Sequence, residues 1–79
     1  MTKMIVSWDL NGLTPTHVQM DEYFKSITVN AKRELETVWS ADYYGTVEQL
    51  RDSLMNFASS NDRILVANFD SAAWYNLLN

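Results

Sequence analysis

The sequence predicts an α+β fold in which two helices cover one face of an antiparallel sheet. Two amphipathic segments each begin with a capping box, and short apolar strand patterns stand before, between and after them. The chain has 79 residues, the size of one small domain, and we assign residues 1–79 to that domain. A domain of this size buries a limited share of its surface and gains stability from dimerisation.

The first predicted strand covers residues 4–10 and is followed at once by a loop. Its sequence, MIVSWDL, is largely apolar, and Asn11, Gly12 and Pro15 end the strand pattern. Asp9 therefore stands at a strand end, where functional side chains are often found. An Asp in this place is also a common turn former, because its carboxylate bonds to nearby backbone groups.

A first helix is predicted to end near Ile27, and the sequence allows two starts for it. Thr14 can act as the N-cap before Pro15, or Thr16 can form a capping box with Gln19. An apolar stripe with the spacing i, i+3, i+4 and i+7 follows, and it consists of Met20, Tyr23, Phe24 and Ile27. This stripe predicts a helix that packs against a sheet.

The middle of the chain predicts a strand with one wetter face. Residues 28–32 are expected to be a polar connection and residues 33–39 a strand. Alternation places Leu35, Thr37 and Trp39 on one side, with Glu34, Glu36 and Val38 on the other. Residues 40–44 either continue this strand or form a third strand after a tight bend.

A second helix and a last strand complete the predicted order. Thr46 and Gln49 form another capping box, and apolar residues at helical spacing extend the helix to about Ser59. Residues 60–62 are a predicted turn, and residues 63–69 are a strand that is apolar on both faces. Residues 71–79 are expected to form a short capped helix that places Trp74, Leu77 and Leu78 on a neighbouring surface.

This order of elements is that of the ferredoxin-like split βαβ fold, written βαββαβ, which leaves the second sheet face bare. Three Trp, four Tyr and three Phe exceed the needs of so small a core, so we expect a homodimer through that face. Burying about 700 Å² there contributes on the order of 15 kcal/mol before association costs. The expected interface residues are Trp8, Trp39, Phe69 and Trp74.

The composition limits the classes of partner and compartment. Ten acidic residues against six basic ones give a net charge of −4, which disfavours nucleic acid as a partner of the monomer. No cysteine is present, so a disulfide framework and a thiolate zinc site are excluded. The chain has no apolar stretch of about 20 residues and no signal-peptide pattern, from which we expect a cytoplasmic protein without a membrane segment.

Other candidate residues favour structural roles. His17 lies in the first helical turn and is expected to face solvent, and Asp62 and Asp70 flank the last strand as predicted turn formers. Five aromatic residues near strand positions could stack the bases of single-stranded nucleic acid, namely Trp8, Trp39, Tyr43, Tyr44 and Phe69. The basic and glycine-punctuated signature of such a platform is missing, which favours core or dimer packing for these residues.

Four segments carry a resemblance that spans nearly the whole chain. IVSWDL at residues 5–10, ETVW at 36–39, QLRDSL at 49–54 and NDRILV at 61–66 resemble small bacterial and phage proteins. That group is related to the second, ferredoxin-fold protein of the CRISPR spacer-acquisition complex and to virulence-associated protein D. The resemblance implies a homodimer with its sheets packed face to face and, in some relatives, Mg²⁺-dependent cleavage of RNA or DNA.

The resemblance places Asp9 at the position of the metal-binding carboxylate of those nucleases. It implies that Asp9 of both subunits holds one Mg²⁺, a cation that takes oxygen ligands. Many relatives have structural roles in which this carboxylate is dispensable, and this chain is more acidic than the nucleases. We therefore expect a homodimeric binding or assembly module of a nucleic-acid-related or defence-related system, with a further protein partner. The alternative is a Mg²⁺-dependent endonuclease, in particular an endoribonuclease.

Overall fold

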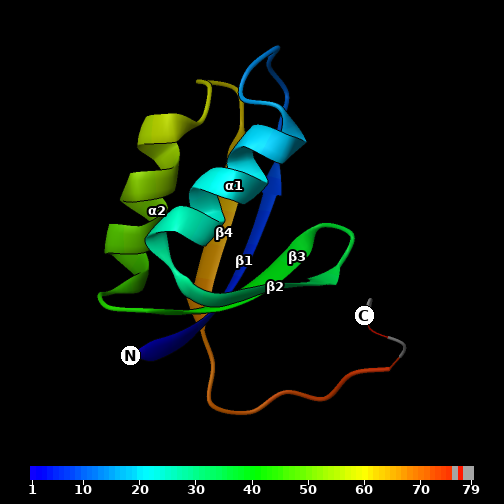
Figure 1. Ribbon diagram of the computed structural model, residues 1–79, viewed down its shortest axis with the longest axis vertical. Helices are drawn as coiled ribbons and strands as arrows, with labels where there is room; N and C mark the ends of the chain where they lie inside the picture. Colours follow the sequence, from blue (N-terminus) through cyan, green and yellow to red (C-terminus); the bar gives the residue numbers. More distant parts are fainter. Residues whose placement is uncertain (76, 78–79) are drawn as a thin grey trace.

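A computed structural model describes residues 1–75 and 77 of the chain. In chain order the elements are β1 (Thr2–Asp9), α1 (His17–Ile27), β2 (Val29–Leu35), β3 (Val38–Tyr43), α2 (Val47–Phe57) and β4 (Arg63–Asn68). The strands form one antiparallel sheet in the order β2-β3-β1-β4 (Figure 1). This arrangement confirms the predicted ferredoxin-like α+β fold.

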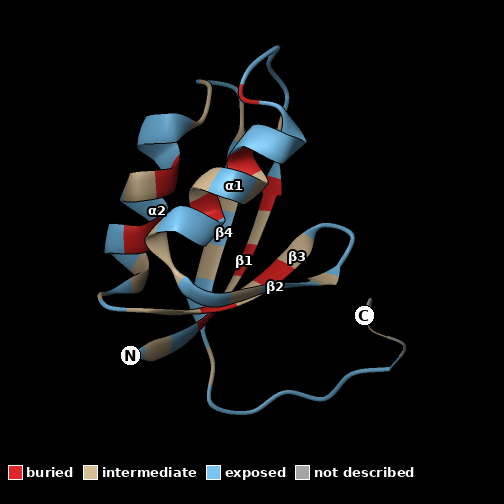
Figure 2. Cartoon of the chain, viewed as in Figure 1, coloured by how far each residue is buried: buried red, intermediate tan, exposed pale blue. Residues whose placement is uncertain are grey.

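Both helices lie on the same face of the sheet, and the core fills the space between the two layers (Figures 1 and 2). The rings of Tyr23 on α1 and Phe57 on α2 stack with their centroids 4.4 Å apart, which joins the helices to each other. The buried core consists of Met4, Val6, Trp8, Met20, Phe24, Trp39, Ala41, Leu50 and Leu54. These residues come from the strands β1 and β3 and from both helices.

The two helices begin where the capping boxes predict. At α1 the Gln19 N–H donates to Thr16 Oγ1 at 3.2 Å, and Gln19 Oε1 accepts from the Thr16 N–H at 2.8 Å. Thr46 and Gln49 make the same pair of bonds at α2, at 3.1 and 2.8 Å. Of the two starts that the sequence allows for α1, the chain uses the one at Thr16, and both reciprocal boxes satisfy otherwise unpaired N–H groups.

The prediction for residues 28–39 is wrong in two places. Residues 29–32 belong to strand β2 rather than to a polar connection, and a turn at Glu36 and Thr37 divides the predicted strand 33–39. The turn brings Leu35 opposite Val38, so these two residues share one face of the sheet, where simple alternation separates them. A register shift next to Glu34 lets consecutive residues of β2 depart from strict alternation.

The predicted place of two tryptophans at a dimer interface is also wrong. Trp8 is 5% exposed and Trp39 is 6% exposed, and both lie on the helix-covered face of the sheet. Their rings meet the Phe24 ring of α1 edge-on, with centroids 5.3 and 5.7 Å apart. The cause is packing, because these large side chains fill the space between the sheet and α1 and are not available to a second subunit.

The chain after β4 is extended and lies on the side of the sheet that faces away from the helices. The predicted short helix is absent from described residues 71–75 and 77, and Leu78 lies outside the described residues. In Figure 1 the orange-to-red segment leaves β4 and runs toward the end of the β2–β3 hairpin. Neither helix in the described part of the chain has the length and apolarity that a bilayer crossing requires.

Candidate functional site: the open face of the sheet

We call the surface of the sheet opposite the helices the open face. Side chains alternate along a strand, so the neighbours of buried residues point to this surface. The open face is formed by Lys3, Ile5, Ser7 and Asp9 of β1, by Val38, Ser40 and Asp42 of β3, and by Arg63, Leu65 and Ala67 of β4. Leu65 is 65% exposed, which is unusual for a leucine in the middle of a strand.

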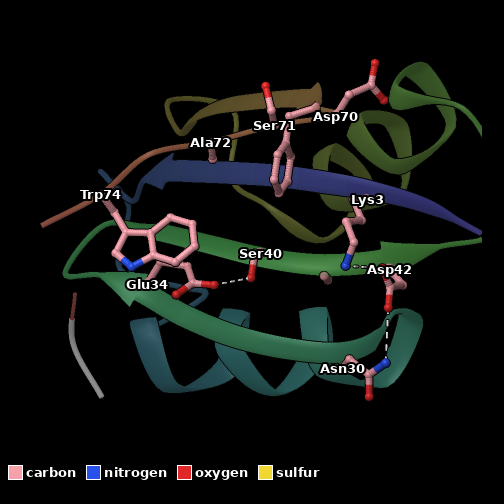
Figure 3. Close-up of a pocket in the computed structure, with 11 residues that line it drawn as sticks. Lys3, Asn30, Glu34, Ser40, Asp42, Asp70, Ser71, Ala72 and Trp74 are labelled. Atoms are coloured by element: carbon pink, nitrogen blue, oxygen red, sulfur yellow. Dashed lines mark hydrogen bonds and ion pairs between the residues drawn. The ribbon is translucent and has the colours of Figure 1, made fainter.

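The segment after β4 lies over part of the open face and leaves two hollows beneath it. The apolar hollow, about 570 Å³, is lined by Ile5, Leu35 and Val38 from the sheet and by Trp74 and Leu77 from the segment, among others. The neighbouring polar hollow, about 440 Å³, is drawn in Figure 3, and Trp74 also lines it. The sheet and the segment above it are therefore only loosely packed against each other.

Charged residues of the polar hollow are held in pairs by the sheet. Ser40 Oγ donates to Glu34 Oε2 at 2.6 Å, and Lys3 Nζ lies 3.9 Å from Asp42 Oδ1 (Figure 3). Among the described residues Glu34 Oε1 is buried without a hydrogen-bond partner, and it lies 3.8 Å from Lys32 Nζ. This cluster escaped prediction because the register shift in β2, which brings Glu34 to Ser40, leaves no mark in the sequence.

Asp9 lies at the exposed end of β1, directly opposite Arg63 of β4. The surface hollow around it, about 270 Å³, is lined by Ser7, Trp8, Asp9, Arg63, Ile64 and Leu65, so Asp9 is its one carboxylate. Among residues 1–75 and 77, no cluster of three or more His, Cys, Asp or Glu side chains could hold a metal ion. In the hollow around Asp9, one copy of the chain therefore offers Mg²⁺ a single carboxylate beside a guanidinium. This is not by itself a magnesium site.

The basic side chains do not form a surface for a phosphate backbone. Five of the six Lys and Arg side chains lie within 4.0 Å of a carboxylate, namely Lys3, Lys25, Lys32, Arg33 and Arg51. Arg63 makes no ion pair with the described residues, and it faces Asp9 across the strands. Cations that are paired with carboxylates attract phosphates more weakly than unpaired ones.

Two further candidate residues lie where the sequence predicts. His17 is exposed in the first turn of α1, and Asp62 closes the turn before β4. The two carboxylate oxygens of Asp62 accept from the Asn11 N–H at 2.7 Å and from the Ser59 N–H at 2.8 Å. The Asn11 bond, opposed by partial burial and helped by Ser59, lowers the pKa of Asp62 below its usual 3.8. Asp70 is exposed in the segment after β4.

We expect Asp62→Ala to destabilise the protein at neutral pH by an amount that shrinks on acidification. The folded-state pKa lies below that of the unfolded chain, about 3.9, so the stabilisation is complete above that pH. It is lost as the pH falls through the lowered pKa. Thermal unfolding from pH 7 to pH 2 should show the melting temperatures of wild type and variant converging below about pH 4. A constant difference over this range contradicts the assignment, and Asp70→Ala is the control.

Comparisons of the chain with protein-family models, with curated proteins and with solved structures gave no significant match. The resemblance carried by residues 5–10, 36–39, 49–54 and 61–66 therefore stays a prediction. The structure shows the open face, with Asp9 at the end of β1 and an apolar hollow over β1, β2 and β3.

Proposed function

We propose that this protein is a homodimeric binding or assembly module, in a nucleic-acid-related or defence-related system, that associates through the open face. The observation that carries the proposal is the apolar surface opposite the helices. Ile5, Val38 and Leu65 belong to three neighbouring strands and point away from the core, and Leu35 joins them at the hairpin. Such a patch on a small domain is typical of a protein interface.

A second copy of the same chain is the partner that suits this face best. In a face-to-face dimer each open face would cover the other, and Ile5, Val38 and Leu65 of both copies would form the apolar centre of the interface. Phe69 and Trp74, both predicted interface residues, lie on this side of the sheet and line the apolar hollow. A protein partner of the dimer would then bind the outer surfaces, including the exposed helix faces.

Leu65→Asp should convert the dimer to a monomer while leaving the fold intact. Leu65 is exposed on the edge strand β4, so an aspartate there remains hydrated in the monomer but would be buried in the dimer. We expect the dissociation constant to rise at least about 100-fold, which corresponds to about 2.7 kcal/mol. Sedimentation equilibrium and circular dichroism measure the two effects.

The matched control is Val18→Asp, because Val18 is 71% exposed on α1, away from the open face. This variant should retain the dimer of the wild type. A wild-type mass near 9.1 kDa at all concentrations up to about 200 µM would contradict the proposal, and so would an unchanged dimer in Leu65→Asp.

A second candidate function, a Mg²⁺-dependent endonuclease, is favoured by the position of Asp9. Its carboxylate is exposed at the end of β1 on the open face, and Arg63 opposite could contact a phosphate. Asp9 of both subunits would hold the ion, which when bound offsets phosphate charge and activates water. This function depends on the proposed dimer, since one chain supplies a single carboxylate here.

For this candidate we expect Asp9→Asn to abolish Mg²⁺-dependent cleavage of single-stranded RNA without loss of folding. Removing the anionic ligand weakens the metal site, while an exposed strand-end side chain adds little to stability. Gel assays on RNA and DNA, with Asp52→Asn on α2 as the control, measure the effect. Absence of cleavage by the wild type on all substrates, or cleavage that survives Asp9→Asn, rules the nuclease out.

A further inference from the structure

We propose that residues 69–75, together with Leu77, are a displaceable cover that competes with a second copy of this chain for the open face. The inference rests on the proposed function, because the competitor is the dimer partner. It differs from the sequence prediction for Trp74, which is expected there to contribute to the interface. In the single chain, Trp74 instead lies over the chain's own sheet (Figure 3).

The cover is tied to the sheet at its beginning and only loosely beyond it. The Phe69 N–H donates to the Lys3 carbonyl at 3.2 Å, which extends the pairing of β4 with β1 by one residue. After that bond, no hydrogen bond or ion pair joins residues 70–75 or 77 to another described residue. A segment held by so few bonds opens at a small free-energy cost.

Trp74 is one of the apolar contacts of the cover with the open face, beside Phe69 and Leu77. Its side chain lines both hollows, together with Ser40 and Glu34 of the sheet, although it is 68% exposed. The neighbouring Tyr75 is 86% exposed and lines neither hollow. Trp74 and Tyr75 are therefore a matched pair of positions for mutation, since Trp74 contacts the hollows beneath the cover and Tyr75 does not.

The cover and a second copy exclude each other because they use the same residues. Ile5, Leu35 and Val38 lie beneath the cover, and they are also central to the apolar surface that the dimer would bury. If the cover is closed in about nine molecules of ten, one face in ten is free. Since both partners must be open, the apparent dissociation constant rises about 100-fold. Anything that draws the cover away would strengthen the dimer.

Two variants of the full chain test the competition. Trp74→Ala should weaken the cover and lower the dimer dissociation constant at least about tenfold, whereas Tyr75→Ala should leave it within about twofold of wild type. Sedimentation equilibrium from 1 to 200 µM, a range of about two decades chosen to bracket micromolar affinity, measures all three proteins. A weaker dimer in Trp74→Ala would place Trp74 in the interface and overturn the cover.

A chemical probe tests the cover independently of the dimer. The chain has no cysteine, so Ser40→Cys introduces a unique thiol beneath the cover, and Ala67→Cys places one on β4 outside both hollows. At dilute, monomeric concentration, adding Trp74→Ala should speed maleimide labelling of the Ser40→Cys protein several-fold and leave the Ala67→Cys protein unchanged. Equal labelling rates of the Ser40→Cys protein with and without Trp74→Ala would contradict the proposed cover.

The two experiments separate the possible failures. If wild type and variants form dimers with equal constants, the proposed function stands and the cover is wrong. If all proteins, Trp74→Ala included, stay monomeric at about 200 µM, the dimer and the competition are both wrong. Faster labelling together with a tighter dimer in Trp74→Ala is the result that the proposal requires.

Discussion

Phe24→Ala is expected to lower the free energy of unfolding by about 3–5 kcal/mol. Phe24 is fully buried on α1, and its ring packs edge-on against Trp8 and Trp39. Truncation leaves a cavity between the helix and two rigid indoles, which can fill it only in part. For a domain of 79 residues the total stability is about 4–12 kcal/mol, so this loss consumes a large part of it.

Urea unfolding followed by circular dichroism measures the change for Phe24→Ala. Leu13→Ala is the matched control, because Leu13 is 97% exposed in the loop before α1 and should change stability by less than about 0.5 kcal/mol. A loss below about 1 kcal/mol for Phe24→Ala would mean that the core between α1 and the sheet is not packed as described.

Trp39→Asp is expected to abolish the cooperative fold rather than merely dissociate a dimer. The Trp39 side chain is 6% exposed and packs against both Phe24 and Trp8, so a carboxylate there is buried among apolar rings. An unpaired charge in such a place costs more than about 4–5 kcal/mol, in addition to the lost aromatic packing. This cost is comparable with the whole stability of a small domain.

The contrast between Trp39→Asp and Leu65→Asp distinguishes the two faces of the sheet. Near-ultraviolet circular dichroism and thermal unfolding should show that Trp39→Asp lacks a folded state and that Leu65→Asp keeps one. A folded, monomeric Trp39→Asp protein would instead mean that Trp39 lies at the dimer interface on the open face, as the sequence predicts. The experiment therefore checks the largest correction that the structure makes to that prediction.

Four elements could be predicted from the sequence because their signals are local. The capping boxes at Thr16 and Thr46 act over three residues, and the apolar stripes of α1 and α2 repeat within two turns. The strands β1 and β4 are short apolar runs bounded by turn residues, and their observed ends lie within two residues of the predicted ones. Asp62 was predicted as a turn former, and both carboxylate oxygens accept backbone bonds.

The hairpin of β2 and β3 could not be predicted because its turn carries no turn signal. Glu36 and Thr37 reverse the chain without a glycine, asparagine or proline, so the alternating pattern reads on through them. A two-residue turn places Leu35 and Val38 side by side on one face and leaves Trp39 on the other. Alternation along the sequence therefore predicts the wrong faces for these residues.

Asp9 as an exposed strand-end residue could be predicted, but the rest of the candidate site could not. The hollow beneath Trp74 joins segments that are far apart in sequence, and the contact of Ser40 with Glu34 depends on the unpredicted turn between β2 and β3. Pairing of Asp9 with Arg63 likewise depends on the register of β1 and β4. Such placements follow from strand pairing and packing across the whole chain, which single-residue patterns do not contain.

By itself, the sequence determined the class of fold, the order of its elements, the start of α2 and the acidic net charge, and it limited the start of α1 to two positions. Capping bonds and helical periodicity involve residues that are close in sequence, and composition does not depend on folding. These features can therefore be recognised in the sequence. Only the tertiary structure decided which face of each strand the helices cover and that the segment after β4 lies over the opposite face. Both faces of β1 and β4 carry apolar residues, so the choice between them depends on which set fills the space against α1 and α2.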